Sequence, residues 1–317
     1  MMSDRALNVV GSQTLRERAF IALQYMIPQH PLSRLVYHVT RSRAPVVKNA
    51  LIKSFMNGFH PDMTEAARPD PSSYASFNDF FTRLLRPDAR PVDPNRSTLV
   101  SPVDGTISQM GSLDGTQLLQ AKGHVYSLEA LLAPPEGADC PGAGQINWVQ
   151  HFSGGSFATL YLAPFNYHRI HMPIGGTLRA AWYVPGKLFS VNAVTASAVP
   201  GLFARNERIV CLFENVNVSF ALVLVGALFV GSMETVWHGE VTPRNPRNHT
   251  RLSLDRARSA LQLAKGAEMG RFNMGSTVIL ILPPDTIDWL PGMQDGRAIR
   301  VGQPLARLRA HKTMDHD

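Results

Sequence analysis

The strongest constraint on the fold is a succession of short apolar runs that starts near Thr98 and continues almost to the end of the chain. Glycine, proline and asparagine separate these runs, as is typical of strands joined by turns. The runs are Phe157–Leu162, Thr177–Val184, Arg208–Phe213, Val216–Val225, Val278–Leu282 and Ala298–Leu308. Their length and spacing predict an α+β fold with a predominantly antiparallel β core, sandwich-like or barrel-like, in a catalytic domain of residues 71–317.

Three segments outside these runs have patterns of their own. The apolar stretch Phe220–Gly231 is shorter than the roughly 20 residues of a membrane-spanning helix, and its two glycines would interrupt a helix, so we predict two core strands there. A helix is expected at Ser127–Leu132. A second helix is predicted to start after Ser76, which forms a capping-box pattern with Asp79, and to run to Leu85.

Residues 1–70 have a helical pattern and carry most of the excess positive charge. The whole chain has a net charge of +7, and residues 1–60 contain eight arginines and lysines against two acidic residues. Apolar residues are interleaved with Arg16 and Arg18, and Pro28 interrupts the pattern before it resumes, which predicts short amphipathic helices. These helices would lie on an anionic membrane surface or pack on the chain's own core with the basic side in solvent, and the pattern fits both arrangements. The cluster at 68–73 is expected to be a linker.

The composition fits a folded globular protein, because 44% of the residues are hydrophobic and 17% are charged. The two cysteines, Cys140 and Cys211, are too few for a disulfide scaffold and lack metal-ligand spacing, which favours a reducing compartment. No secretory signal is evident at the start of the sequence, so we expect a cytoplasmic protein. The arginine-rich segment Thr242–Arg258 is expected to form an exposed loop.

The first indication of chemistry is the tripeptide Gly275, Ser276 and Thr277, directly before the β-branched run at 278–282. A serine hydroxyl next to a glycine carbonyl can attack its own peptide bond if the fold strains that bond and supplies a base and an oxyanion donor. By itself, the tripeptide is more typical of a turn that leads into a buried strand.

Three further segments change this interpretation. They are Ser101–Ile107 (SPVDGTI), Tyr161–Pro173 (YLAPFNYHRIHMP) and Val225–Trp237 (VGALFVGSMETVW). In this order, and together with the Gly-Ser-Thr step, they closely resemble the phosphatidylserine decarboxylases, pyruvoyl enzymes of the longer bacterial type, over about residues 77–305. One residue departs from the family pattern, because Met274 stands where leucine is common, and the two side chains are similar in volume and polarity.

The resemblance implies that the chain cuts itself between Gly275 and Ser276. Ser276 would attack the Gly275 carbonyl to form an ester, elimination would give dehydroalanine, and hydrolysis with loss of ammonia would leave a pyruvoyl group. This covalent group, derived from Ser276, would be the cofactor, at the start of a small chain (276–317) that separates from a large chain (1–275). By the same resemblance, Asp104 orients His171, His171 is the base and Ser276 is the nucleophile of the processing step.

A second reaction is also implied by the resemblance. The pyruvoyl group would form a Schiff base with phosphatidylserine and accept electrons as carbon dioxide leaves, which gives phosphatidylethanolamine. His168 matches the family histidine assigned to this decarboxylation and would protonate the carbanion, and Tyr161 is a candidate for positioning. No metal is expected, since no third ligand motif accompanies His168 and His171. Glu234 belongs to a matching motif but receives no chemical role.

The implied partners are phosphatidylserine, an anionic membrane surface and a second copy of the chain in a homodimer, with no nucleic acid. The expected location is the cytoplasmic side of the cell membrane, as a peripheral protein. A pyruvoyl decarboxylase of a related serine-headed lipid is the nearest alternative. A non-enzymatic basic membrane-binding or nucleic-acid-binding module would explain the pI of about 9.7. A serine hydrolase is disfavoured, because Ser276 lacks the Gly-x-Ser-x-Gly pattern.

Overall fold

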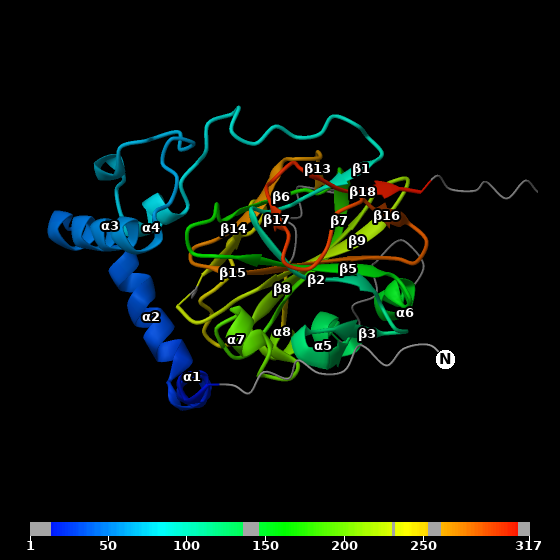
Figure 1. Ribbon diagram of the computed structural model, residues 1–317, viewed down its shortest axis with the longest axis horizontal. Coiled ribbons are helices and arrows are strands. Elements are labelled where there is room, and N and C mark those ends of the chain that lie inside the picture. Colours follow the sequence, from blue (N-terminus) through cyan, green and yellow to red (C-terminus); the bar gives the residue numbers. More distant parts are fainter. Residues whose placement is uncertain (1–13, 136–145, 230–231, 253–260, 310–317) are drawn as a thin grey trace, which may run out of the picture.

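The central element of the fold is a nine-stranded sheet (Figure 1). The computed structural model describes residues 14–135, 146–229, 232–252 and 261–309. The strand order is β12-β7-β8-β9-β15-β5-β2-β17, and β13 also pairs with β7. The strands are β2 (Gly105–Ser112), β5 (Ser156–Leu162), β7 (Gly176–Val184), β8 (Arg208–Glu214), β9 (Ser219–Val225), β12 (Thr250–Arg251), β13 (Gln262–Leu263), β15 (Ser276–Leu282) and β17 (Ala298–Ile299).

Every pairing within this sheet is antiparallel, so the predicted antiparallel β core is confirmed. The closed form of the prediction is not found, because the strand order of the described residues runs from β12 to β17 and has two free ends. The sheet is therefore open at both edges.

Three smaller antiparallel sheets share the hydrophobic core of the large one. They are formed by β1 (Thr98–Val100), β18 (Pro304–Leu308) and β16 (Ile287–Trp289); by β11 (Gly239–Glu240), β10 (Met233–Thr235), β14 (Glu268–Phe272) and β6 (Arg169–His171); and by β3 (Gln117–Leu119) and β4 (Val125–Ser127). The three sheets contribute Leu99, Met269 and Leu118, respectively, to one cluster of buried side chains that also contains residues of the large sheet. The described β-rich part of the chain is thus built around a common core.

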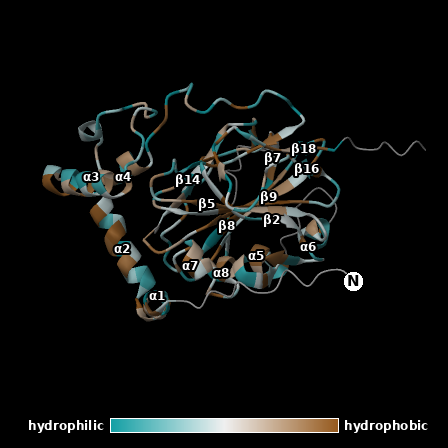
Figure 2. Cartoon of the chain, viewed as in Figure 1, coloured by the Kyte–Doolittle hydropathy of each residue, from teal (hydrophilic) through white to brown (hydrophobic). Residues whose placement is uncertain are grey.

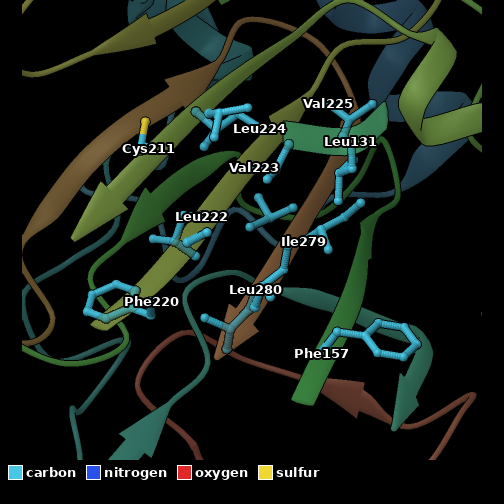
Figure 3. Close-up of a cluster of buried hydrophobic side chains, with 14 of the residues drawn as sticks. Leu131, Phe157, Cys211, Phe220, Leu222, Val223, Leu224, Val225, Ile279 and Leu280 are labelled. Carbon is cyan, nitrogen blue, oxygen red and sulfur yellow. The ribbon is translucent and has the colours of Figure 1, made fainter. Parts of the chain in front are cut away.

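Strand β15 lies in the interior of the large sheet. It pairs with β5 along all seven of its residues and with β9 along five, and each of its residues is buried. Figure 3 shows Ile279 and Leu280 of this strand among buried side chains that include Leu222, Val223 and Leu224 of β9. Buried β-branched and leucine side chains favour this central position, where both strand edges are paired.

Three helices precede the sheets and stand to the left of them in Figure 1: α1 (Leu15–Met26), α2 (Gln29–Thr40) and α3 (Pro45–Phe59). Thr14 and Glu17 form a capping box that starts α1, and residues 27–28 separate it from α2, as the proline break predicts. Their surfaces mix apolar and polar residues (Figure 2). Among the described residues, no helix combines the length and the apolar character that a membrane span requires.

A second hydrophobic cluster joins this helical region to the β core. Ile52 and Phe55 of α3 pack there with Tyr74 and with the aromatic side chains of α4 (Phe77–Phe81). Met274 packs against both this cluster and the main core. The residue before Gly275 therefore lies where the two clusters meet.

Several predicted elements are confirmed, and others need correction. The helix after Ser127 is α5 (Leu128–Leu132), with Ser127 as its cap. The helix capped by Ser76 ends at Phe81 instead of Leu85, because residues 84–86 form backbone hydrogen bonds with residues 65–67. The remaining short α-helices are α6 (Trp148–Phe152), α7 (Ala193–Ala196) and α8 (Leu202–Arg205).

The prediction of two strands within Phe220–Gly231 is wrong for the described residues. Only β9 is present, and it ends at Val225. Gly226 makes one more in-register hydrogen bond, to the Glu207 carbonyl, and residues 228–229 then form a turn. Residues 230–231 lie outside the described part of the chain. The run at 298–308 forms two strands, which a turn at Gly302 (φ 84°) separates.

The segment Thr242–Arg258 is not wholly an exposed loop. Thr242 is buried, and Thr250 and Arg251 form β12 beside β7. Residues 253–258 lie outside the described part of the chain, as does Cys140. Cys211 is a buried free cysteine within β8, and burial raises the pKa of its thiol.

A buried glutamate directly before β8 makes the free energy of unfolding depend on pH. Glu207 is 3% exposed, accepts a hydrogen bond from the Tyr183 hydroxyl at 2.8 Å, and has a pKa that burial raises to about 7. Because the folded state then holds this proton above pH 4.5 while the unfolded state releases it, the free energy of unfolding falls as pH rises from about 4.5 to about 7.

We expect Glu207→Gln to remove up to about 3 kcal/mol of that pH dependence, since each pKa unit corresponds to about 1.4 kcal/mol. Urea unfolding at pH 5 and pH 8 measures it in a Ser276→Ala background, chosen so that the chain stays in one piece, with the exposed Glu129→Gln as the matched control. Equal pH dependence in wild type and Glu207→Gln would contradict the prediction.

Candidate functional site

Ser276 is the first residue of the central strand β15. It is 0% exposed and pairs with Leu162 of β5. Its Oγ is buried and has no hydrogen-bond partner among the described residues. An unpaired buried hydroxyl costs free energy, so this position calls for a functional explanation.

His168 supplies a second unpaired atom in the same place. Its Nδ1–H donates to the carbonyl of Asn166 at 2.8 Å, so its Nε2 carries the lone pair. That Nε2 is buried without a partner, and a Cβ built on Gly275 would lie 3.5 Å from it. The imidazole packs against Phe81, with ring centroids 4.3 Å apart. The unprotonated nitrogen of His168 therefore lies beside the Gly275–Ser276 step.

The environment of His168 keeps its ring neutral. Its pKa is lowered to about 3, mainly by complete burial and to a smaller extent by the positive charge of Arg83. The hydrogen bond to the Asn166 carbonyl opposes this shift but does not cancel it. A neutral imidazole with a free Nε2 is a proton acceptor, and it becomes a donor only when an anion nearby raises its pKa.

His171, at the end of β6, has both ring nitrogens occupied. Its Nδ1–H donates to the Gly266 carbonyl at 2.7 Å, and the Tyr167 hydroxyl donates to its Nε2 at 3.1 Å. Burial lowers the pKa of His171, whereas the Gly266 carbonyl and the charges of Glu268 and Asp104 raise it. The backbone N–H of His171 donates to the Pro102 carbonyl, which brings this strand to the segment that carries Asp104.

Asp104 lies in the turn before β2 and is 4% exposed. Its carboxylate accepts from the Arg90 guanidinium at 2.9 Å and from the backbone N–H of Val301 at 2.8 Å. Arg90 also pairs with Glu65. Gly105 follows, and a Cβ there would lie 2.2 Å from the Tyr161 carbonyl oxygen, so only glycine allows this close approach of β2 to β5.

The structure thus brings together Gly275, Ser276, His168 and Tyr161, whose strand neighbour is Thr277. Asp104 and His171 lie on adjoining segments, but no hydrogen bond among the described residues joins either of them to Ser276 or joins them to each other. The hydrogen bonds expected within a processing triad of Asp104, His171 and Ser276 are therefore not formed among the described residues of the uncut chain.

An apolar cavity opens at the same step. Its volume is about 240 Å³, and Met274, Gly275, Tyr161 and Leu162 line it on the side of the sheet. The other side consists of aromatic residues from α3, α4 and the loop after β9: Phe55, Phe59, Phe81 and Phe229. Phe59 is 45% exposed and Phe229 40%. The arrangement can hold an apolar group against Gly275, with an aromatic rim toward solvent.

Sequence reasoning missed Arg83, a buried cation near His168. Arg83 is 3% exposed; its Nη2 donates to the Phe165 carbonyl at 3.3 Å, and its Nε and Nη1 are buried without partners. It lines a cavity of about 360 Å³ together with Asp104 and Tyr167. The aromatic run after Ser76 indicated a helix here, but no sequence pattern indicated that a charged residue just beyond it is buried.

A second missed feature holds the segment before the Gly-Ser step. The Asn78 side chain of α4 donates to the Asn273 carbonyl at 3.1 Å, and the Asn273 side chain donates to the Ser232 hydroxyl at 2.5 Å. Glu234 pairs with Arg271 across β10 and β14, which agrees with a structural carboxylate. No group of three or more His, Cys, Asp or Glu that could hold a metal occurs within the described ranges.

Comparison with known proteins matches the sequence of this chain to one family. The family model described as phosphatidylserine decarboxylase matches residues 77–307, and a second one, described as PSD, matches residues 19–60. A phosphatidylserine decarboxylase proenzyme of Bordetella pertussis is 48% identical over 92% of this chain and 95% of its own length. Proenzymes of the same description from Azotobacter vinelandii (47% identity, 92% and 99% coverage) and Shewanella frigidimarina (48%, 91% and 98%) are similarly close.

Proposed function

This chain belongs to the phosphatidylserine decarboxylase family and is a carboxy-lyase, and we propose that it removes carbon dioxide from the serine head group of phosphatidylserine and leaves phosphatidylethanolamine. From this premise we propose how its own residues act: the chain cuts itself at Gly275–Ser276, and the new terminus at residue 276 carries a pyruvoyl group. The observation that carries the proposal is the pair of unpartnered buried atoms, Ser276 Oγ and His168 Nε2, at a step that adjoins an apolar cavity.

In the processing step, Ser276 Oγ attacks the Gly275 carbonyl carbon and loses its proton to a base. We assign the base role to His171 and the orienting role to Asp104, as the family pattern implies. For His171 to accept this proton, Tyr167 must release its Nε2, because the hydroxyl occupies that nitrogen in the uncut chain. The hydrogen bonds of Asn273 with Asn78 and Ser232 support the step, since they fix the backbone just before the bond that breaks.

In the decarboxylation step, a pyruvoyl group at residue 276 supplies an electron-accepting carbonyl for an amine substrate. The residues around position 276 fit this group, because the unpartnered Nε2 of His168 and the apolar cavity both adjoin it. We propose that His168 holds the proton that replaces the lost carboxyl group. Its pKa, low in the free protein, rises when an anionic head group lies beside the ring. Tyr161, half-buried in the cavity wall, positions the substrate.

The substrate reaches this site from a membrane in our proposal. Exposed apolar side chains occur on all three N-terminal helices: Leu15, Leu23, Met26, Leu35 and Val46 are each more than half exposed. Basic residues accompany them, and Phe59 and Phe229 extend the apolar surface to the cavity rim. Peripheral attachment of residues 1–70 to the cytoplasmic face would let the acyl chains enter the cavity without leaving the bilayer. Assembly as a homodimer remains a prediction.

The experiment that tests this function combines a mass measurement with an assay. The purified protein should give two chains under denaturing conditions, divided after Gly275, with the small chain lighter by one ammonia than a serine-started peptide. It should release carbon dioxide from vesicles that contain phosphatidylserine and form phosphatidylethanolamine. Cleavage without turnover of phosphatidylserine, but with turnover of another serine-headed lipid, would show that the proposed substrate is wrong and would support the proposed pyruvoyl chemistry.

A further inference from the structure

Three arginines line a cavity between α2 and the segment 243–247, separate from the cavity at the Gly275–Ser276 step. The cavity has a volume of about 540 Å³. Arg34 of α2 lines one wall, and Arg244 and Arg247 line the other. None of these three arginines forms an ion pair with a residue that the structure describes.

The positive charges of these arginines shift the pKa values of neighbouring ionisable groups. His30, inside the cavity, donates its Nε2–H to the Gly186 carbonyl at 3.0 Å, and its pKa is lowered by burial and then by the charges of Arg247, Lys187 and Arg34. Arg247 and Arg244 also act on the buried Tyr183, whose hydroxyl donates to Glu207, and the Arg244 guanidinium lies 5.6 Å from the Tyr183 ring centroid. Charges from two separate elements therefore converge on one space.

Among the described residues that line this cavity, the only carboxylate is that of Glu207. It is 3% exposed and already accepts the Tyr183 hydroxyl, so it is not available as a partner for three guanidinium groups. His38 also faces the cavity. Like charges held on facing walls repel each other, and a bound anion would remove that cost.

We propose that this cavity binds a phosphate group, and that the phosphate belongs to an anionic phospholipid head group other than the substrate in the decarboxylation site. Guanidinium groups on two walls suit the oxygens of a phosphate, which accepts several charge-assisted hydrogen bonds at once. The rim favours a lipid source, because Leu35 lines the cavity while 60% exposed. An adjoining cavity of about 260 Å³ shares His30, Pro31 and Arg247 and includes Tyr25 of α1, which is 52% exposed.

The bound phosphate would also link two parts of the molecule. Arg34 belongs to α2 in the N-terminal helical region, whereas Arg244 and Arg247 follow β11 in the β-rich part. An anion between them would add a bridge to the direct contacts that already hold α2 to the core, such as the Arg41–Glu240 ion pair and the hydrogen bond from the Leu188 N–H to Gln29. A lipid bound in the cavity would therefore strengthen the attachment of α2.

The test compares the triple variant Arg34→Gln, Arg244→Gln, Arg247→Gln with a control that loses the same charge elsewhere. The control is Arg96→Gln, Arg297→Gln, Arg307→Gln, three exposed arginines of the β-rich part without ion pairs to described residues. Vesicles of phosphatidylglycerol in phosphatidylcholine, free of phosphatidylserine, are sedimented with each protein. We expect the cavity variant to bind them at least about tenfold more weakly than the control.

A second arm identifies the source of the phosphate. Inorganic phosphate should raise the melting temperature of the wild type and of the control, but not of the cavity variant, at concentrations where chloride of equal ionic strength does not. Stabilisation by free phosphate combined with equal vesicle binding by both variants would assign the site to a soluble phosphate instead of a lipid. Equal behaviour of the two variants in both arms would overturn the proposal. Intact-mass analysis of each variant keeps this outcome separate from a failure of self-cleavage, which the cavity does not serve.

Discussion

Ser276→Ala should remain a single chain of 317 residues and should have no measurable decarboxylase activity. The variant lacks the oxygen that attacks the Gly275 carbonyl, so neither the cut nor the group that the cut creates can form. The loss of activity should be on the order of 10⁴-fold or more, as is found when a nucleophile that acts within a catalytic unit is removed. Mass spectrometry of the denatured protein measures the cut directly.

The matched control for this variant is Thr277→Val. Thr277 is the next residue of β15, is 0% exposed, and carries an Oγ1 that has no hydrogen-bond partner among the described residues. Valine replaces it with nearly the same shape, so Thr277→Val should cut itself and retain activity. An uncut Thr277→Val chain would mean that β15 tolerates no change near the step, and a cut Ser276→Ala chain would remove Ser276 from the mechanism.

The second large effect separates the two histidines. His168→Ala should still be cut, but its decarboxylase activity should fall by about 10²–10⁴-fold, the usual contribution of a general acid or base. His171→Ala should remain uncut. The division follows from their surroundings: a pKa of about 3 makes His168 a weak base in the uncut chain. Burial also lowers the pKa of His171, but the Gly266 carbonyl and the charges of Glu268 and Asp104 oppose that shift.

Both histidine variants are measured in the same way, by intact mass first and then by release of carbon dioxide from phosphatidylserine vesicles. Circular dichroism confirms that each variant is folded. A His168→Ala chain that stays whole, next to a His171→Ala chain that cuts, would exchange the two roles. That outcome would fit the short distance between His168 Nε2 and the Gly275 position, so the mass spectrum decides between the geometry of the uncut chain and the family pattern.

The sequence predicted the β core well because its strands bury almost every side chain. In β8, β9 and β15, runs of Val, Leu, Ile and Phe are bounded by turn residues, and such runs carry both the element type and its approximate limits. The errors occurred where contacts between distant segments decide the outcome. Leu85 looked helical, but pairing with Ala66 draws it into an extended conformation. The run after Val225 looked like a second strand, but residues 228–229 form a turn in which the backbone N–H of Phe229 donates to the Ser33 hydroxyl of α2 at 3.3 Å.

The site shows the same division between local and distant information. The motifs identified Gly275, Ser276 and the two histidines, but the direction of each ring depends on an irregular segment at 163–168. The Asn166 carbonyl and the Phe81 ring turn His168 toward Gly275, while Gly266 and Tyr167 hold His171. None of these four partners follows from the spacing of the histidines. Arg83 was missed for a related reason, since its burial depends on packing against Phe80 and Phe165.

The interior position of β15 has a consequence for how the mature enzyme can exist. After a cut at Gly275, the small chain would hold β15, β16, β17 and β18. β16 pairs with β18 within the small chain, whereas the other partners, β5, β9, β2 and β1, belong to the large chain. Folding of the precursor is a unimolecular event, whereas refolding of the cut enzyme would require two separate polypeptides to meet and to rebuild the middle of a sheet. Once denatured, the mature protein should therefore recover in a concentration-dependent manner or not at all, and its lifetime would be set by the rate of unfolding.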